Sequence, residues 1–213
     1  MPAPMTLQGR LVQLEPLTPE MIGALLEAAT EPEGTSPFTL IPQDPDAMGT
    51  YVSSALRDQE AGRALAFAIR LVEHDRIVGS TRFLDLDYWQ GPLAWPPGAN
   101  RGPVGDVPDV AEIGSTWLAP SARRTGANHE AKLLMLGHAF DTWNVHRVTL
   151  KTDARNSRSR AAITRLGAHF EGVRRAHVRA VDGTVRDTAY FSIVRAEWPE
   201  IRQRLQNRLS LTP

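Results

Sequence analysis

Residues 121–140, SARRTGANHEAKLLMLGHAF, place two arginines directly in front of a run of helix-forming residues. The Ala, Leu, Met and Phe residues of this run predict a helix over about 126–142. The N-terminus of a helix is positive, because its first N–H groups lack helical partners and the peptide dipoles add up. Arg123 and Arg124 therefore add repulsion at that end of the helix. We expect a bound anion to offset it.

The preceding residues extend this stretch into a strand–turn–helix unit. Residues 110–118, VAEIGSTWL, alternate and predict a strand, and Gly126 lies in the turn that follows. Backbone N–H groups from about Arg123 to Asn128 then form a cradle suited to phosphate. The unit contains neither the G-x-G-x-x-G of dinucleotide-binding folds nor the G-K-[ST] of P-loops. The alternative interpretation is that the arginines are solvated surface charges and the glycine is merely a turn residue.

A second strand–turn–helix unit follows. Residues 146–153, HRVTLKTD, alternate apolar and polar side chains and predict a strand. Residues 157–166 predict a helix, for which Gly167 is a natural C-cap. Asn156 and Ser159 lie at the turn between them, where the Asn amide offers both a donor and an acceptor to an amide-bearing ligand. The alternative interpretation is that Asn156 or its neighbour only caps the helix.

The remaining segments predict one domain over 1–213 with a mixed sheet and helices on both faces, an α/β (α+β) fold. Thr18-Pro19 starts a helix, and Asp182-Gly183 is a hairpin turn. Residues 88–109 are rich in Pro and Gly and predict a long loop. The other predicted strands are 10–17, 65–72, 76–87, 168–180 and 186–195, and the other predicted helices are 18–29, 45–60 and 197–208.

The composition narrows the classes of function. Lys plus Arg equals Asp plus Glu at 24, so the net charge is zero and bulk attraction to nucleic acid or anionic membrane is not indicated. The chain has no cysteine, which excludes disulfides, thiolate metal sites and a Cys nucleophile. No apolar run reaches transmembrane length and the first residues have no signal-peptide core. We therefore expect a cytoplasmic protein with no membrane or nucleic-acid partner.

Several units in order resemble the GNAT N-acetyltransferase superfamily, and within it the branch of ribosomal-protein N-terminal acetyltransferases (Rim type). They are the E-I-G strand, an R-x-x-G turn, an N-x-x-S turn, the R-L-G-A helix end and the final D-G hairpin with RDTAYFSI. The resemblance covers roughly residues 7–200. It implies a mostly antiparallel central sheet flanked by helices, the acyl-CoA N-acyltransferase fold, and acetyl-CoA as cosubstrate without a metal.

The resemblance also implies roles for particular residues. The family's turn [QR]-x-x-G-x-[GA], whose amides hold the pyrophosphate of acetyl-CoA, falls on Arg123, Arg124, Thr125, Gly126, Ala127 and Asn128. Asn128 departs from the usual Gly or Ala and brings a side chain close to the phosphate path. Backbone groups of Thr116, Trp117 and Leu118 would pair with the pantetheine arm. Asn156 would contact the same arm, and Ser159 would lie near the sulfur.

Without a cysteine, an acetyl-cysteine intermediate is impossible, and we expect direct transfer in a ternary complex. Glu112, at the start of the central strand, is the candidate general base, acting through water. The alternative is a surface carboxylate at a strand end. Ser159 is the candidate for stabilising or protonating the thiolate, since no Tyr occurs between Asn156 and Gly172.

The acceptor stays open at this point: a protein N-terminal amine or a small-molecule amine, with a homodimer possible. One rival interpretation is a catalytically silent acyl-CoA-binding or regulatory protein on the same fold, because fold does not settle function. Another is an RNA-associated protein with a basic patch. His129 and His138 are nine residues apart, which is not the spacing of a helical metal pair, and His138 is expected to be a satisfied, partly buried residue.

Overall fold

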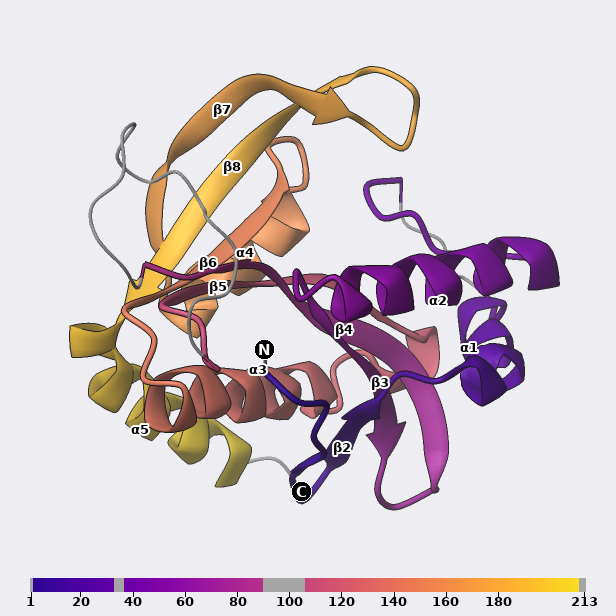
Figure 1. Cartoon of the computed structure of the whole chain (residues 1–213), viewed down its shortest axis with the longest axis horizontal. Coiled ribbons are helices and arrows are strands. Elements are labelled where there is room, and N and C mark those ends of the chain that lie inside the picture. Colours follow the sequence, from indigo (N-terminus) through magenta and orange to yellow (C-terminus); the bar gives the residue numbers. More distant parts are fainter. Residues whose placement is uncertain (1, 33–36, 90–105, 211–213) are drawn as a thin grey trace.

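A computed structural model describes residues 2–32, 37–89 and 106–210. One eight-stranded sheet runs through them in the order β1-β2-β3-β4-β5-β6-β8-β7, with helices on both faces (Figure 1). The strands are β1 Leu7–Gln8, β2 Val12–Pro16, β3 Leu65–Leu71, β4 Arg76–Asp87, β5 Val110–Leu118, β6 Arg147–Asp153, β7 His169–Arg179 and β8 Val185–Val194. The helices are α1 Ile22–Ala29, α2 Pro45–Glu60, α3 Ala127–Gly137, α4 Ser157–Leu166 and α5 Trp198–Ser210.

The mixed, mostly antiparallel sheet predicted from the sequence is confirmed. Every neighbouring pair of strands is antiparallel except β5 and β6, which the helix α3 connects as a parallel pair. The sequence prediction missed β1, which is only two residues long. It was also wrong about a single α-helix over 126–142, because α3 ends at Gly137 and the chain continues as a π-helical turn over His138–Thr142.

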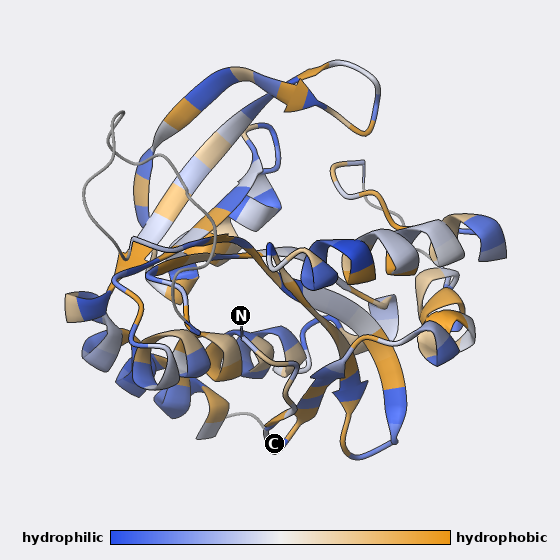
Figure 2. Ribbon diagram, in the orientation of Figure 1, coloured by the Kyte–Doolittle hydropathy of each residue, from blue (hydrophilic) through white to orange (hydrophobic). Residues whose placement is uncertain are grey.

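Adjacent residues of the central strands show which helices cover which face. Trp117 donates to the Tyr51 hydroxyl of α2, whereas Thr116 accepts from Lys132 of α3, so these helices lie on opposite faces. Arg204 of α5 donates to the Leu166 carbonyl at the end of α4 and joins these two helices. Buried hydrophobic side chains fill the interfaces between the sheet and the helices on each of its faces. The helix α1 is largely hydrophobic (Figure 2).

The sheet opens between β5 and β6. Residue pairs join these strands only over Val110–Glu112 and Arg147–Thr149, after which β5 continues along β4 and β6 continues along β8. A bulge accompanies the opening: Ser115 has a φ of 49°, and the register with β4 shifts beside it. The β7–β8 hairpin consequently projects away from the first half of the sheet (Figure 1).

The predicted 88–109 loop lies mostly outside the described residues. The described Trp89 is exposed and stacks on His146 with ring centroids 5.5 Å apart. Its backbone N–H donates to Asp109 and its indole N–H donates to Asp87. These contacts hold the first part of the segment against the sheet.

Candidate active site

The turn before α3 has the backbone that its sequence predicts. Arg124 and Gly126 both have positive φ angles, 67° and 90°, and Gly126 is the N-cap of α3. The Thr125 hydroxyl donates to the Ala122 carbonyl at 2.8 Å and fixes the turn. The Glu130 N–H makes the first described helical bond, to the Gly126 carbonyl. The N–H groups before Glu130 form a helix N-terminus of the kind that binds anions.

Two guanidinium groups from different units lie near enough to each other beside this turn to interact electrostatically. Arg123 donates through Nε to the Leu118 carbonyl at 3.2 Å. Burial lowers the pKa of Arg123, and the charge of Arg158, in the first turn of α4, lowers the pKa further. Arg158 is therefore close enough to repel Arg123. A bound polyanion would relieve that repulsion.

The predicted pantetheine-binding stretch lies where β5 leaves β6. The Thr116 and Trp117 side chains are engaged on opposite faces of the sheet, with Lys132 at 2.6 Å and Tyr51 at 3.3 Å. Only backbone groups of this stretch that point away from β4 can therefore face the opening. The Leu118 carbonyl already receives the Arg123 bond.

Asn156 caps α4, as the alternative interpretation of this residue predicted. Its side-chain oxygen accepts a bond of 3.0 Å from the Ser159 N–H. This bond uses one of the amide's functional groups and leaves its two N–H donors. Ser159 is half-buried in the first turn of α4.

Glu112 is buried in the floor of the site, with only 3% of its surface exposed. This excludes the alternative of a surface carboxylate. Its Oε2 lies 2.6 Å from the Lys151 ammonium, which also contacts Asp85 at 2.9 Å. Burial raises the pKa of Glu112 to about 7, against the lowering effect of Lys151 and with a further raising effect of Asp85. A carboxyl group with this pKa is present in both its protonated and its ionised form near neutral pH.

A bulge in β4 brings Asp85 to this cluster. Asp85 has a φ of 45°, and the register between β4 and β5 shifts between Leu84 and Asp87. Burial raises the pKa of Asp85, but Lys151 outweighs it and the net pKa is lowered. Burial lowers the pKa of Lys151, but Glu112 and Asp85 together outweigh it and the net pKa is raised. Lys151 therefore stays charged between two carboxyl groups.

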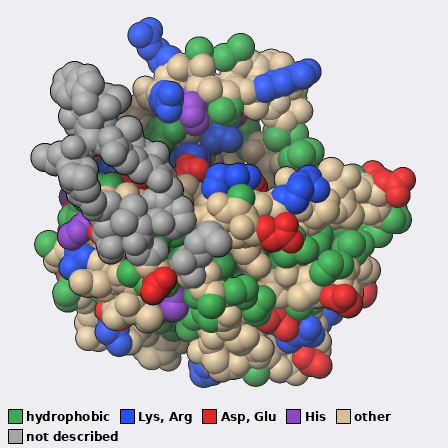
Figure 3. Space-filling view, viewed as in Figure 1, with side chains coloured by type: hydrophobic (Ala, Val, Ile, Leu, Met, Phe, Trp, Pro, Cys, Tyr) green, Lys and Arg blue, Asp and Glu red, His purple; other side chains and the backbone are tan. Residues whose placement is uncertain are grey.

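An open cavity of about 440 Å³ lies over Glu112. Figure 3 shows basic and acidic side chains gathered in the hollow between the β7–β8 hairpin and α2. The volume falls within the range of small-molecule sites. The cavity is lined by Arg63, Asp85, Leu86, Asp87, Val110, Ala111, Glu112, Arg147, Thr149 and Tyr190.

Comparison with known proteins gives this arrangement a family. The model for the acetyltransferase (GNAT) domain matches residues 11–169. The chain belongs to the GNAT acetyltransferase family. This confirms the resemblance inferred from the sequence. The matched region includes the GNAT turn motif and both strand–turn–helix units, whereas β1, all but the first residue of β7 and all of β8 lie outside it.

Solved structures agree with the GNAT assignment. A GCN5-related N-acetyltransferase from Brucella melitensis is 27% identical with a TM-score of 0.80, over 97% of this chain and 86% of that one. An acetyltransferase described as putative from T. thermophilus is 29% identical with a TM-score of 0.75, over 98% and 99%. Mycobacterium smegmatis RimJ, in complex with CoA-disulfide, is 23% identical with a TM-score of 0.74, over 96% and 95%. No curated protein matches the chain.

Sequence reasoning missed Lys151, Asp85, Arg147 and Tyr190 in this GNAT site. The alternation of residues 146–153 contained a signal, since it places Arg147, Thr149 and Lys151 on one face of β6. What it lacked was the strand order, which sets that face beside Glu112. The roles of all these residues, and of the twelve predicted site residues, stay predictions.

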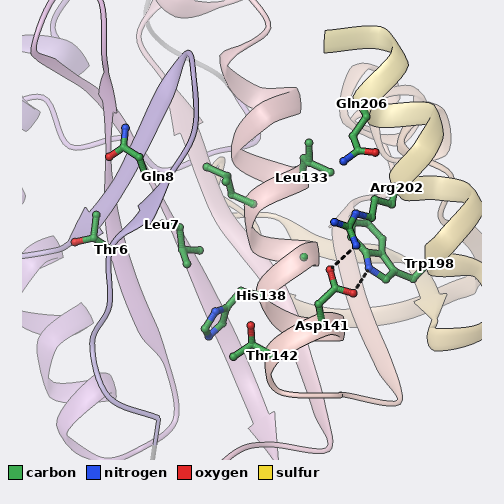
Figure 4. Close-up of a pocket in the computed structure, with 12 residues that line it drawn as sticks. Thr6, Leu7, Gln8, Leu133, His138, Asp141, Thr142, Trp198, Arg202 and Gln206 are labelled. Carbon is green, nitrogen blue, oxygen red and sulfur yellow. Dashed lines mark hydrogen bonds and ion pairs between the residues drawn. The ribbon is translucent and has the colours of Figure 1, made fainter. Parts of the chain in front are cut away.

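A second cavity of about 350 Å³ lies between β1, α3 and α5 and is lined by none of the predicted site residues (Figure 4). On one side Asp141 accepts from Trp198 and pairs with Arg202. On the other lies His138, which is partly buried as expected. Its buried Nε2, however, has no partner among the described residues, so this nitrogen is not satisfied as expected. Burial lowers the pKa of His138 and favours the neutral ring.

Within the described ranges no helix is both long and apolar enough to cross a bilayer. Among the same residues no three His, Asp or Glu side chains gather in a way that suits a metal ion.

Proposed function

We propose that this GNAT protein is an acetyl-CoA-dependent N-acetyltransferase that moves the acetyl group directly to a primary amine in a ternary complex. The observation that carries the proposal is Glu112. It is a buried carboxylate with a pKa of about 7, at the last residue pair before β5 and β6 part, and it lines an open cavity. A base of this pKa is matched to an amine at neutral pH.

Acetyl-CoA would supply the thioester carbonyl. The residues present suit such a ligand, because the Arg123–Asn128 turn offers amides and positive charge to its pyrophosphate. The backbone of Thr116–Leu118 and the remaining Asn156 donors would hold the pantetheine arm. The fold is shared with RimJ, whose structure contains CoA-disulfide. Asn128, in the first turn of α3, would border the phosphates.

The chain's own groups would handle the protons. Glu112 would accept the proton of the incoming ammonium, directly or through water, so that the neutral amine attacks the carbonyl. Lys151 would hold the Glu112 carboxylate in place and keep this residue ionised in a fraction of the molecules. As the C–S bond breaks, the proton that the acetylated nitrogen loses would pass to the departing thiolate, to which Ser159 would donate a hydrogen bond. With no cysteine in the chain, no acetyl group can rest on a thiol of the enzyme.

The phosphate cradle can be tested by calorimetry with acetyl-CoA. Arg123→Ala/Arg124→Ala should weaken binding tenfold or more, a loss of at least ~1.4 kcal/mol. Arg57→Ala, an exposed arginine of α2, is the matched control and should leave the affinity unchanged. Absence of binding by the wild type would overturn the proposal.

The general base can be tested by release of CoA in the presence of a panel of primary amines. Glu112→Gln keeps the shape of the side chain and should lower kcat/KM by about 100-fold or more, with acetyl-CoA affinity unchanged. If the wild type binds acetyl-CoA but acetylates no amine, the silent acyl-CoA-binding protein is the better assignment.

A further inference from the structure

Arg147 is the least engaged cation of the cavity. Its partner among the described residues is the Glu171 carboxylate, at 3.5 Å from Nη1. Its Nε is buried and has no hydrogen-bond partner. By contrast, Lys151 has contacts of 2.6 and 2.9 Å with carboxylates, and Arg63 lies 2.6 Å from Asp58. A guanidinium has five N–H donors, so Arg147 retains donors for a ligand.

The carboxylates of the same cavity are in the opposite situation. Glu112 and Asp85 both contact Lys151, and Asp87 accepts from the indole N–H of Trp89 at 2.9 Å. Each acid therefore already has a donor within the described part of the chain. Among these charged groups, Arg147 is the one with unused donors, and the ligand group complementary to a guanidinium is an anion.

The strand register fixes where this anion would lie relative to the reacting amine. Arg147, Thr149 and Lys151 share one face of β6, and Thr149 is directly opposite Glu112. Arg147 is therefore two residues from the position opposite the base, about 7 Å along the strand. The cavity is about 440 Å³ and includes all of Arg147, Thr149 and Glu112 in its lining. An amine at Glu112 and an anionic group at Arg147 can belong to one small molecule.

We infer that the acetyl acceptor is a small amine that carries a carboxylate, and that Arg147 binds this carboxylate. This inference rests on the proposed function. The planar guanidinium pairs with a carboxylate through two parallel hydrogen bonds, which fixes the orientation of the ligand as well as its position. Glu171 accepts from Ser192 at 2.6 Å and so keeps a partner when Arg147 turns to the ligand. Arg147 is thus a specificity-determining residue.

The test compares kcat/KM for matched acceptor pairs: L-methionine with L-methioninamide, and L-phenylalanine with L-phenylalaninamide. The amine of each amide is the less basic of the pair and more of it is neutral, so a preference for the acid opposes intrinsic reactivity. We expect the wild type to favour the acids at least tenfold. Arg147→Met should remove the preference, mainly through the KM of the acid, and Arg147→Lys should retain part of it. Arg57→Met is the matched control.

The outcomes separate this inference from the proposed function. If the wild type acetylates the amides as well as the acids, or acetylates only a diamine or an unblocked peptide with an amidated C-terminus, the inference is overturned while the acetyltransferase stands. A preference unchanged in Arg147→Met also overturns it. Failure of the wild type to bind acetyl-CoA overturns the proposed function itself. Acetyl-CoA calorimetry on Arg147→Met, with unchanged affinity expected, shows that the variant is folded.

Discussion

Two opposing effects set the proton affinity of Glu112. Burial raises its pKa to about 7, and the Lys151 ammonium at 2.6 Å lowers it. The active form of a general base is the ionised one, so kcat/KM should rise with pH through about 7. Lys151 therefore decides how much base is present at neutral pH, although it touches neither substrate in the proposed mechanism.

Lys151→Met should move the acid limb of the kcat/KM profile to higher pH. Loss of the ammonium leaves burial and Asp85 unopposed, so the pKa of Glu112 rises further. The midpoint is expected to move by about one pH unit or more, because an opposite charge at this distance has an effect of that size. A pH–rate profile measures it. Lys151→Arg keeps the charge and is the control, and a midpoint that stays in place in Lys151→Met would contradict the assignment.

Lys132 is a second buried cation, with a different effect. Its ammonium lies under the sheet, donates to the Thr116 hydroxyl and has no acidic partner among the described residues. Burial lowers its pKa to about 7, against about 10.4 for lysine in an unfolded chain. The unfolded state therefore binds this proton more tightly. The free energy of unfolding should therefore rise with pH between about 7 and 10. The loss of stability caused by burying Lys132 is greatest below pH 7.

Lys132→Met should raise the free energy of unfolding at pH 7 by about 2–4 kcal/mol, and the gain should shrink toward pH 10. The Thr116 hydroxyl keeps its contact with Thr81 at 2.7 Å. Urea unfolding at pH 7 and at about pH 9.5 measures both effects. Arg57→Met, on the surface, should not change the pH dependence. A variant less stable than the wild type at pH 7 would show that the contacts of Lys132 stabilise the fold by more than burial of its charge destabilises it.

At the scale of elements, Glu130 ties the first strands to α3. Its carboxylate accepts from the backbone N–H groups of Arg10, Leu11 and Val12 at 3.0, 2.6 and 2.7 Å. Glu130 is the acidic residue of the first turn of α3, yet its charge is used by the β1–β2 turn. The positive end of α3 thus remains available to an external anion.

Glu130→Ala should lower the free energy of unfolding by about 2–4 kcal/mol, because three backbone donors lose a charged acceptor. Urea unfolding at constant pH measures the loss. Glu60→Ala, at the exposed end of α2, is the matched control and should stay within about 0.5 kcal/mol. Equal effects of the two substitutions would mean that solvent replaces the carboxylate at little cost.

Most elements were predictable because their patterns are local. Alternation identified β5 and β6, and Asp182-Gly183 identified the β7–β8 hairpin. The misses have physical reasons. A two-residue strand such as β1 has no periodicity, and the turn that joins it to β2 is bound by Glu130, more than a hundred residues away. In the π-helical turn after Gly137, His138 packs against Phe83 and Trp143, and these contacts are not visible in the helical pattern of the sequence.

At the scale of the whole molecule, the candidate site depends on contacts distant in sequence. The turn around Gly126 could be predicted, since its arginines, glycine and helix are contiguous. The surroundings of Glu112 could not, because Asp85 and Lys151 reach it only through the strand order β4-β5-β6 and the bulge in β4. Burial of Glu112 is likewise a property of the folded sheet.

Ligand binding should stabilise the whole chain, because the proposed acetyl-CoA site takes groups from both sides of the opening between β5 and β6. Acetyl-CoA at about a hundred times its Kd should add about 2.7 kcal/mol and raise Tm by about 5–10 °C. Differential scanning calorimetry measures it. Arg123→Ala/Arg124→Ala at the same acetyl-CoA concentration should show a smaller rise. A Tm independent of acetyl-CoA would contradict binding to the folded state.

The bonds of Glu130 to residues 10–12 also make these residues a reporter on the N-terminal end of α3. The amides of Arg10, Leu11 and Val12 exchange with solvent deuterium only when their bonds to Glu130 open. Glu130 donates its backbone N–H to the Gly126 carbonyl, so we expect an anion bound at the first turn of α3 to slow that opening. Deuterium uptake at residues 10–12 should therefore report the occupancy of the proposed anion site at the first turn of α3, although those residues contribute no atom to that site.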